Sequence, residues 1–375
     1  MPLDWKIFTQ RPYIKSLSLE EQIRLFNIAN EKSIRLREQR FIDFANSNST
    51  SQGAAGGNPE NAAEPLLLDT FGEGALLAVS MRKLRTAYTG FSMRIQRTGT
   101  AGSTGTADDQ ADLHFDSNGY TSLDSAITPV TAGVLSTTLG EFCAASGHSN
   151  PDSLASANTV EVTKFYNQTE DTTITEFPQG AVGQFNELVI NGVLETITIG
   201  GDDFVALNVG WREGYSVITT AGGPPPITTF TVTNVKDPAG SFTQESVSLT
   251  PSAYNGDSFF VRYDDTTDQF DVFDGRNGIQ ILSSTNTFAT DTPYLFTTLL
   301  QDATDLTAYF VNNALQDSRT DFTHTNRNNF SRIKYNQQNK ASGPEFMEGI
   351  YYIASKQSDI AAINQNIMNY YNLST

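Results

Sequence analysis

Residues 66–97, LLLDTFGEGALLAVSMRKLRTAYTGFSMRIQR, contain a change of hydrophobic period that decides how the fold is interpreted. In the first part, Leu77, Met81 and Leu84 recur at helical spacing while basic residues take the other face, which predicts an amphipathic helix ending by Gly90. After Gly90, apolar and polar residues alternate along FSMRIQR, as they do in a strand with one buried face. We therefore expect a short covering helix that leads directly into a β-sheet.

Residues 77–97 also resemble a segment of many bacteriophage structural proteins, in which a helix with SLRKLR precedes AYTG and a strand of alternating arginine and apolar residues. In that family the segment precedes a laminin-G or concanavalin A-like domain. The stretch KFYNQTEDTTITEF at 164–177 is similar to the family's WYDQSGNG-like turn and keeps Tyr166 and Gln168, with Phe165 and Asn167 at the Trp and Asp positions. Residues 191–209 resemble the paired strands that follow, and 349–375 resemble the closing strand and short helix. The resemblance implies a mainly β fold, an antiparallel β-sandwich of the jelly-roll kind.

The composition limits the partners of the chain. Its 42 acidic and 24 basic residues give a formal net charge of −18. A field of that sign repels phosphate backbones, so we expect no nucleic-acid partner. No run approaches the ~20 apolar residues of a membrane-spanning helix, and the N-terminus lacks the apolar segment of a secretory signal, so we expect no membrane insertion.

The sequence predicts three parts of the chain. Residues 1–45 form an attachment segment, residues 46–65 form a glycine-rich linker of small residues, and residues 66–375 form a sandwich domain. A capping box at Ser18 and Glu21 starts a helix within the first segment. This helix either packs on its own domain or serves oligomerisation and anchoring. We favour the second interpretation and expect a homotrimer, because the segment carries apolar side chains with no evident partner: Trp5, Phe8, Tyr13, Ile23, Phe26, Ile34, Phe41 and Phe44.

From about residue 113 the sequence predicts strand after strand, with turn residues between them. Asn191 and Gly192, between two apolar runs, predict a two-residue hairpin turn, because type I′ turns need positive φ at both positions. Numerous strands with one covering helix argue for two packed antiparallel sheets. A last helix from Ser358 to about Tyr371 should lie on this sandwich through its isoleucine face.

The sequence offers no catalytic motif, so we expect no catalytic residues, and carboxylates are the abundant reactive groups. Asp264, Asp265 and Asp268 lie in a short connection between two strands, where their oxygens could converge on Ca²⁺. A solvated hairpin tip explains the same residues without a metal. Asp202 and Asp203 form a second, weaker candidate site.

Aromatic residues supply the candidate ligand-binding positions. Trp211 and Tyr215 combine flat apolar faces with polar neighbours, as sugar or protein surfaces prefer. Tyr166 and Gln168 join them through the resemblance. The alternative for the aromatic pair is a place in the core of the sandwich.

Together these features and the resemblance imply a virion protein, assembled in the host cytoplasm, whose partners are tail, baseplate or capsid proteins. We expect a tail-fibre or baseplate-associated adhesin that binds host-surface glycan. Two alternatives stay open: a capsid decoration or head-fibre protein with a structural role, and a glycan hydrolase.

Overall fold

The computed structural model describes residues 66–98, 109–152, 158–170, 175–178, 186–208, 216–217, 226–235, 244–250, 259–264, 267–274, 279–284, 286–301, 306–320, 332–337 and 344–374. All of them belong to one unit, residues 55–375. The predicted attachment segment and linker, with the apolar residues from Trp5 to Phe44, lie outside the described residues. None of the described helices is long and apolar enough to cross a membrane.

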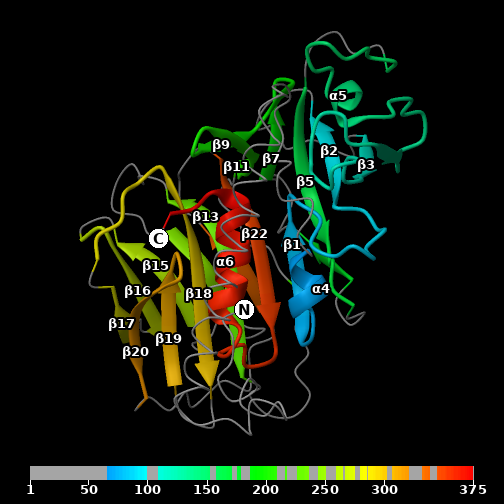
Figure 1. Cartoon of the computed structure of the whole chain (residues 1–375). Helices are drawn as coiled ribbons and strands as arrows, with labels where there is room; N and C mark the ends of the chain where they lie inside the picture. Colours follow the sequence, from blue (N-terminus) through cyan, green and yellow to red (C-terminus); the bar gives the residue numbers. More distant parts are fainter. Residues whose placement is uncertain are drawn as a thin grey trace, which may run out of the picture. The chain divides into compact units, whose positions relative to one another are not determined.

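The larger sheet has fourteen strands among the described residues (Figure 1): β1 (Ala75–Ser80), β2 (Met93–Thr98), β3 (Gln110–Leu113), β4 (Ile127–Pro129), β5 (Thr159–Tyr166), β6 (Glu176–Pro178), β7 (Asn186–Ile190), β8 (Val193–Leu194), β11 (Leu207–Asn208), β13 (Ile227–Val235), β18 (Thr292–Gln301), β19 (Leu306–Val311), β20 (Ala314–Arg319) and β22 (Pro344–Tyr352). Its main path runs β20-β19-β18-β13-β22-β11-β7-β5-β2-β3-β4, and β1 pairs with β22. The first and last of the described strands therefore meet in the middle of the sheet.

The smaller sheet has the order β12-β21-β14-β15-β16-β17, with the bounds β12 (Ser216–Val217), β14 (Gln244–Thr250), β15 (Phe259–Asp264), β16 (Gln269–Asp274), β17 (Ile279–Ser283) and β21 (Arg332–Gln337). Neighbouring strands pair antiparallel in both sheets. A separate antiparallel pair and three short helices complete the described elements: β9 (Thr196–Ile199), β10 (Asp202–Val205), α4 (Leu67–Phe71), α5 (Leu139–Phe142) and α6 (Ile360–Tyr371).

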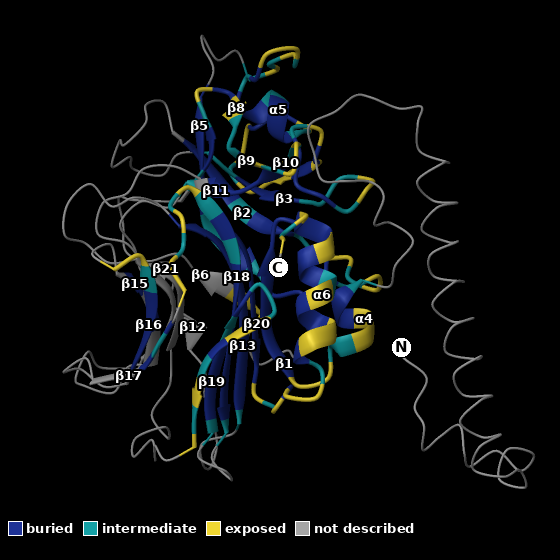
Figure 2. Ribbon diagram, turned by 60° about the vertical axis from the view of Figure 1, so that its left-hand side comes forward, coloured by how far each residue is buried: buried dark blue, intermediate teal, exposed yellow. Residues whose placement is uncertain are grey.

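The two sheets pack face to face, and α6 covers the other face of the larger sheet (Figure 2). The rings of Phe270 on β16 and Phe296 on β18 have centroids 4.4 Å apart, and the Tyr309 hydroxyl on β19 donates to the carbonyl oxygen of Phe270 at 3.0 Å. On the helical side, Thr297 on β18 hydrogen-bonds Asn364 of α6 at 2.6 Å. The predicted mainly β fold, an antiparallel sandwich, is confirmed.

Two local predictions are also confirmed. Asn191 and Gly192 form the turn between β7 and β8 with φ angles of 50° and 78°. The last helix runs from Ile360 to Tyr371 and buries the predicted face, whose members are Ile360, Ile363, Ile367 and Tyr370.

The helix predicted over the first part of residues 66–90 is wrong. Helix α4 ends at Phe71, and Leu77 lies in strand β1, while Met81 and Leu84 are buried in the irregular segment that follows. Strand β1 is buried on both faces, since Val79 belongs to the core between the sheets and Ala78 to the core under α6. A strand that is buried on both faces is apolar at consecutive positions and does not alternate with polar residues. Its apolar residues therefore also fit the spacing of an amphipathic helix.

Candidate functional site

Strand register brings polar side chains from four strands into one row on a face of the larger sheet. Asp112 of β3 lies opposite Thr128 of β4 on one side and Arg94 of β2 on the other, and Arg94 lies opposite Lys164 of β5. Because successive residues of a strand point to opposite faces, this row lies across from the buried Met93 and Ile95. The sheet thus fixes these side chains on a rigid surface.

Charged groups in the row are paired with each other. Arg94 donates from Nε and Nη2 to the two carboxylate oxygens of Asp112, at 2.8 and 2.9 Å. The Tyr166 hydroxyl donates to Asp112 Oδ1 at 2.7 Å. Lys164 pairs with Glu176 of β6, and its Nζ lies 5.0 Å from the centroid of the Tyr166 ring. Both cations of the row therefore have a carboxylate partner.

These contacts fix the protonation states. Burial alone would raise the pKa of Asp112, but the hydrogen bonds from Arg94 and Tyr166 outweigh it and hold that pKa below its ordinary value. Burial, and then the bond to Asp112, raises the pKa of the Tyr166 hydroxyl. Near neutral pH, Asp112 is a carboxylate and Tyr166 a donor, so the network has one arrangement.

Aromatic rings flank the charged row. The Phe91 ring lies 5.6 Å from the Tyr166 ring and 4.6 Å from the His114 ring, by centroids. All three side chains are partly exposed. We call the set formed by Phe91, Arg94, Asp112, His114, Lys164, Tyr166 and Glu176 the Tyr166 face. It combines partly exposed rings with charged groups held in place, which suits a ligand that has both an apolar surface and hydroxyl groups.

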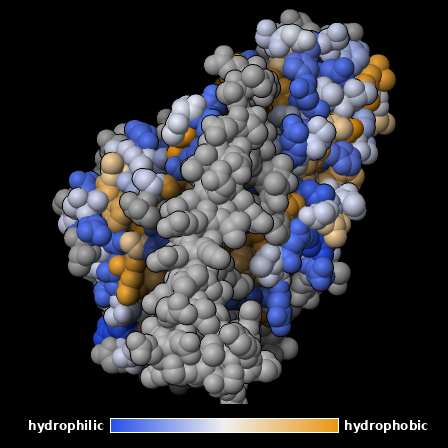
Figure 3. Space-filling model, viewed as in Figure 1, coloured by the Kyte–Doolittle hydropathy of each residue, from blue (hydrophilic) through white to orange (hydrophobic). Residues whose placement is uncertain are grey.

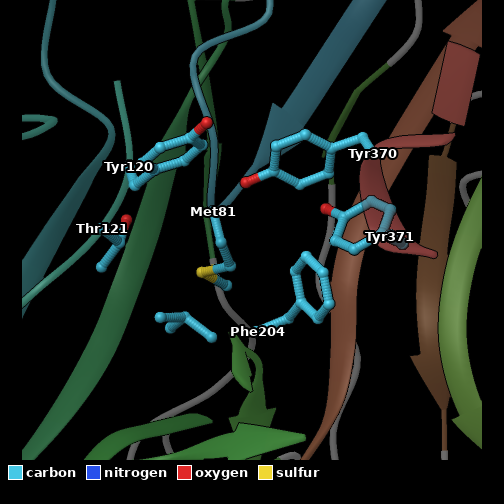
Figure 4. A pocket seen from close by; sticks show the side chains of 7 residues that line it. Met81, Tyr120, Thr121, Phe204, Tyr370 and Tyr371 are labelled. Carbon is cyan, nitrogen blue, oxygen red and sulfur yellow. The ribbon is translucent and has the colours of Figure 1, made fainter. Parts of the chain in front are cut away.

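The pocket shown in Figure 4 is of a different kind. Its lining residues are Met81, Tyr120, Thr121, Phe204, Val205, Tyr370 and Tyr371. The centre of a water molecule can move within about 10 Å³ of this pocket. That space suits about one water molecule. A sugar ring does not fit in this pocket. Among the described residues, the Tyr166 face is an open surface that leaves room for a larger ligand.

Gln168, expected beside Tyr166 as a ligand-binding residue, has a different position. Its side chain is fully buried; it accepts from the Leu84 backbone N–H at 2.7 Å and donates to the Arg82 carbonyl at 3.0 Å. The neighbouring Asn167 side chain accepts from the Ala78 N–H at 2.8 Å in the same manner. Gln168 therefore stabilises the segment after β1 and presents nothing to a surface ligand, which corrects that expectation.

Most of the remaining predicted ligand residues cannot be placed in the structure. Trp211 and Tyr215 lie outside the described residues, as does Asp265, and of Asp264 only the backbone at the end of β15 is described. Asp268 is exposed in the β15–β16 turn with φ 54°, and it accepts a hydrogen bond from the Tyr263 hydroxyl at 2.7 Å. Within the part of the chain that the structure describes, no three His, Cys, Asp or Glu residues cluster as a metal site.

Calcium binding at the β15–β16 turn stays a prediction. If Asp264, Asp265 and Asp268 hold Ca²⁺ together, a chelator should lower the melting temperature, because an ion that binds only the folded state stabilises it. A melting curve that chelator leaves unchanged would remove this site.

Sequence reasoning missed most of the Tyr166 face. The alternation of Arg94 with apolar neighbours places it on the outer face of a strand, but nothing local shows that Asp112 is its partner. Asp112 lies in a polar stretch whose strand, β3, has four residues. Register between separate strands brings the two side chains together, and a single sequence does not show that register.

Comparisons with known proteins give structural similarity without sequence similarity. The sequence matches no family model and no curated protein. Among solved structures, a sialidase of Trypanosoma rangeli in complex with 2,3-difluoro-KDN matches 55% of this chain at 9% identity and a TM-score of 0.37, and the match covers 31% of that enzyme. The CBM40 module of a Ruminococcus gnavus sialidase, bound to α2,3-sialyllactose, matches 37% of this chain and 82% of its own at 8% identity and a TM-score of 0.30. The carbohydrate-binding module CBM66 of Bacillus subtilis matches 42% and 87% at 12% identity and a TM-score of 0.27.

Proposed function

We propose that this chain is a structural protein of a bacteriophage particle and that its Tyr166 face binds glycan on the host surface. The virion part of the proposal rests on the resemblance of residues 77–97 to phage structural proteins. The glycan part rests on one observation: the partly exposed Phe91 and Tyr166 rings lie beside the paired charges of Arg94 and Asp112. Sugars have an apolar C–H face and a rim of hydroxyls, and this surface matches both features.

Removing the Tyr166 ring should weaken glycan binding by about tenfold, equivalent to roughly 1.4 kcal/mol of binding free energy. The Tyr166→Phe variant keeps the ring and loses the bond to Asp112, so it should retain more affinity than Tyr166→Ala. Binding is measured on an array of immobilised bacterial surface polysaccharides. Leu315→Ala is the matched control, because Leu315 is exposed on β20, a strand separate from this face.

Two results would contradict the proposal. If the wild-type chain binds no polysaccharide on the array, the glycan role is lost, and the structural alternative, a capsid decoration or head-fibre protein, takes its place. If Tyr166→Ala binds as tightly as wild type, the site lies elsewhere on the chain. Release of reducing sugar from a bound polysaccharide would instead support the hydrolase alternative.

The attachment part of the proposal concerns residues 1–45. We expect the full chain to have three times the mass of one chain in solution, and a fragment of residues 66–375 to fold as a monomer, because the unpaired apolar residues of the first segment need a partner to bury them. Light scattering gives the masses, and a cooperative melt shows that the fragment folds. A monomeric full chain would show that residues 1–45 do not serve oligomerisation. A fragment with no cooperative melt would show that the predicted domain boundary is wrong.

A further inference from the structure

The charges of the Tyr166 face balance one another. Arg94 and Lys164 supply two positive charges, and Asp112 and Glu176 supply two negative charges, in two ion pairs. Arg94 has two of its donor nitrogens, Nε and Nη2, on the carboxylate of Asp112, at 2.8 and 2.9 Å. An incoming carboxylate would have to compete for Arg94 with a partner that is already bidentate and largely buried.

The net charge of the chain adds to this effect. At −18, the protein repels a polyanion at long range, and the balanced Tyr166 face offers no local positive field to reverse that repulsion. In Figure 3, hydrophilic residues predominate on the described surface around β2, β3 and α5, with smaller hydrophobic areas among them. On the Tyr166 face itself, attraction must come from ring contacts with Phe91 and Tyr166 and from hydrogen bonds to groups that are already ion-paired.

We infer that the Tyr166 face selects neutral glycans over glycans that carry carboxylates. This inference rests on the proposed function and specifies the class of its ligand. A neutral sugar can stack on the rings and exchange hydroxyl hydrogen bonds with paired carboxylates without breaking either ion pair. An acidic sugar would gain most from an uncompensated positive charge, and both cations of this face already have a carboxylate partner.

The test uses two polymers that differ only at C6, which is a carboxylate in polygalacturonic acid and a primary alcohol in the neutral galactan obtained by reducing it. Binding of the full chain to each immobilised polymer is measured at low and at physiological salt. We expect the neutral polymer to bind at least about tenfold more tightly, with little dependence on salt, because screening acts on net charge.

The Glu176→Gln variant provides the sharper comparison. Glu176 is exposed, with 45% of its side chain accessible, so the substitution should leave the fold intact while it frees Lys164. The ratio of acidic to neutral affinity should then rise about fivefold, since a free ammonium can pair with a carboxylate of the polymer. Glu73→Gln is the matched control: it makes the same charge change at an exposed residue in the turn between α4 and β1, and its ratio should equal that of wild type.

The outcomes separate the inference from the function on which it rests. Tighter binding of polygalacturonic acid by the wild-type chain would overturn the neutral preference and leave glycan binding standing. A ratio that Glu176→Gln does not change would show that the ion pair does not set the preference, and the inference would fail. If the wild-type chain binds neither polymer and no polysaccharide on the array, the proposed glycan function itself is overturned, and the inference with it.

Discussion

Replacing Arg82 with methionine should lower the free energy of unfolding by about 3–5 kcal/mol, because the change strands the buried carboxylate of Glu348. Arg82 donates from Nε and Nη2 to Glu348 at 2.7 and 3.1 Å, and their side chains are only 5% and 1% exposed. Ser80 and Tyr371 also donate to Glu348, at 2.9 and 3.1 Å. Burial alone would lower the pKa of Arg82, but Glu348 raises it above its ordinary value, so the guanidinium stays charged.

The arginine also connects separate parts of the fold. It lies just after β1, its partner lies on β22, and its guanidinium carbon is 4.1 Å from the centroid of the Tyr370 ring on α6. Loss of Arg82 therefore weakens the contact between the central strands and the covering helix. Urea unfolding followed by circular dichroism measures the loss.

Arg85 is a matched control three residues away. It pairs with Glu170 at 2.6 Å, but that carboxylate is 82% exposed, so Arg85→Met should cost less than about 1 kcal/mol. The double variant Arg82→Met with Glu348→Gln removes the stranded charge and should recover part of the loss. Equal, small effects of Arg82→Met and Arg85→Met would show that the Arg82–Glu348 pair does not stabilise the fold.

Replacing Gln168 with leucine should lower the free energy of unfolding by about 2–4 kcal/mol, since it leaves a buried backbone donor and a buried acceptor unpaired. These are the N–H of Leu84 and the carbonyl of Arg82, which Gln168 now satisfies. Leucine has a similar volume, so the change tests the hydrogen bonds more than the packing. Hydrogen exchange gives a local readout: the Leu84 amide should lose protection in the variant.

Gln365→Leu on the exposed face of α6 is the control, with an expected effect within about 0.5 kcal/mol. If Gln168→Leu unfolds like wild type and the Leu84 amide keeps its protection, Gln168 does not hold the segment after β1.

The sequence by itself determined the features whose physical cause is local. Alternation of apolar and polar residues gave the strand from Met93, the paired positive φ angles of Asn191 and Gly192 gave the hairpin, and the isoleucine spacing gave the last helix. The abundance of strands gave the class of fold. In each case the residues that carry the signal are neighbours along the chain, so one sequence contains the whole argument.

Tertiary structure alone decided the features that depend on partners far away in the chain. The run ALLAVS at 75–80 became a strand because β22, almost 270 residues later, pairs with it and both of its faces are covered. The sequence predicts that Arg82 is a solvated residue of a helix. In the structure Arg82 is buried, which is possible because Glu348 neutralises its charge. Asp112 and Tyr166 became part of one surface only through the register of β2, β3 and β5. Short apolar runs and single charged residues have several stable environments, and contacts across the sheet select one of them.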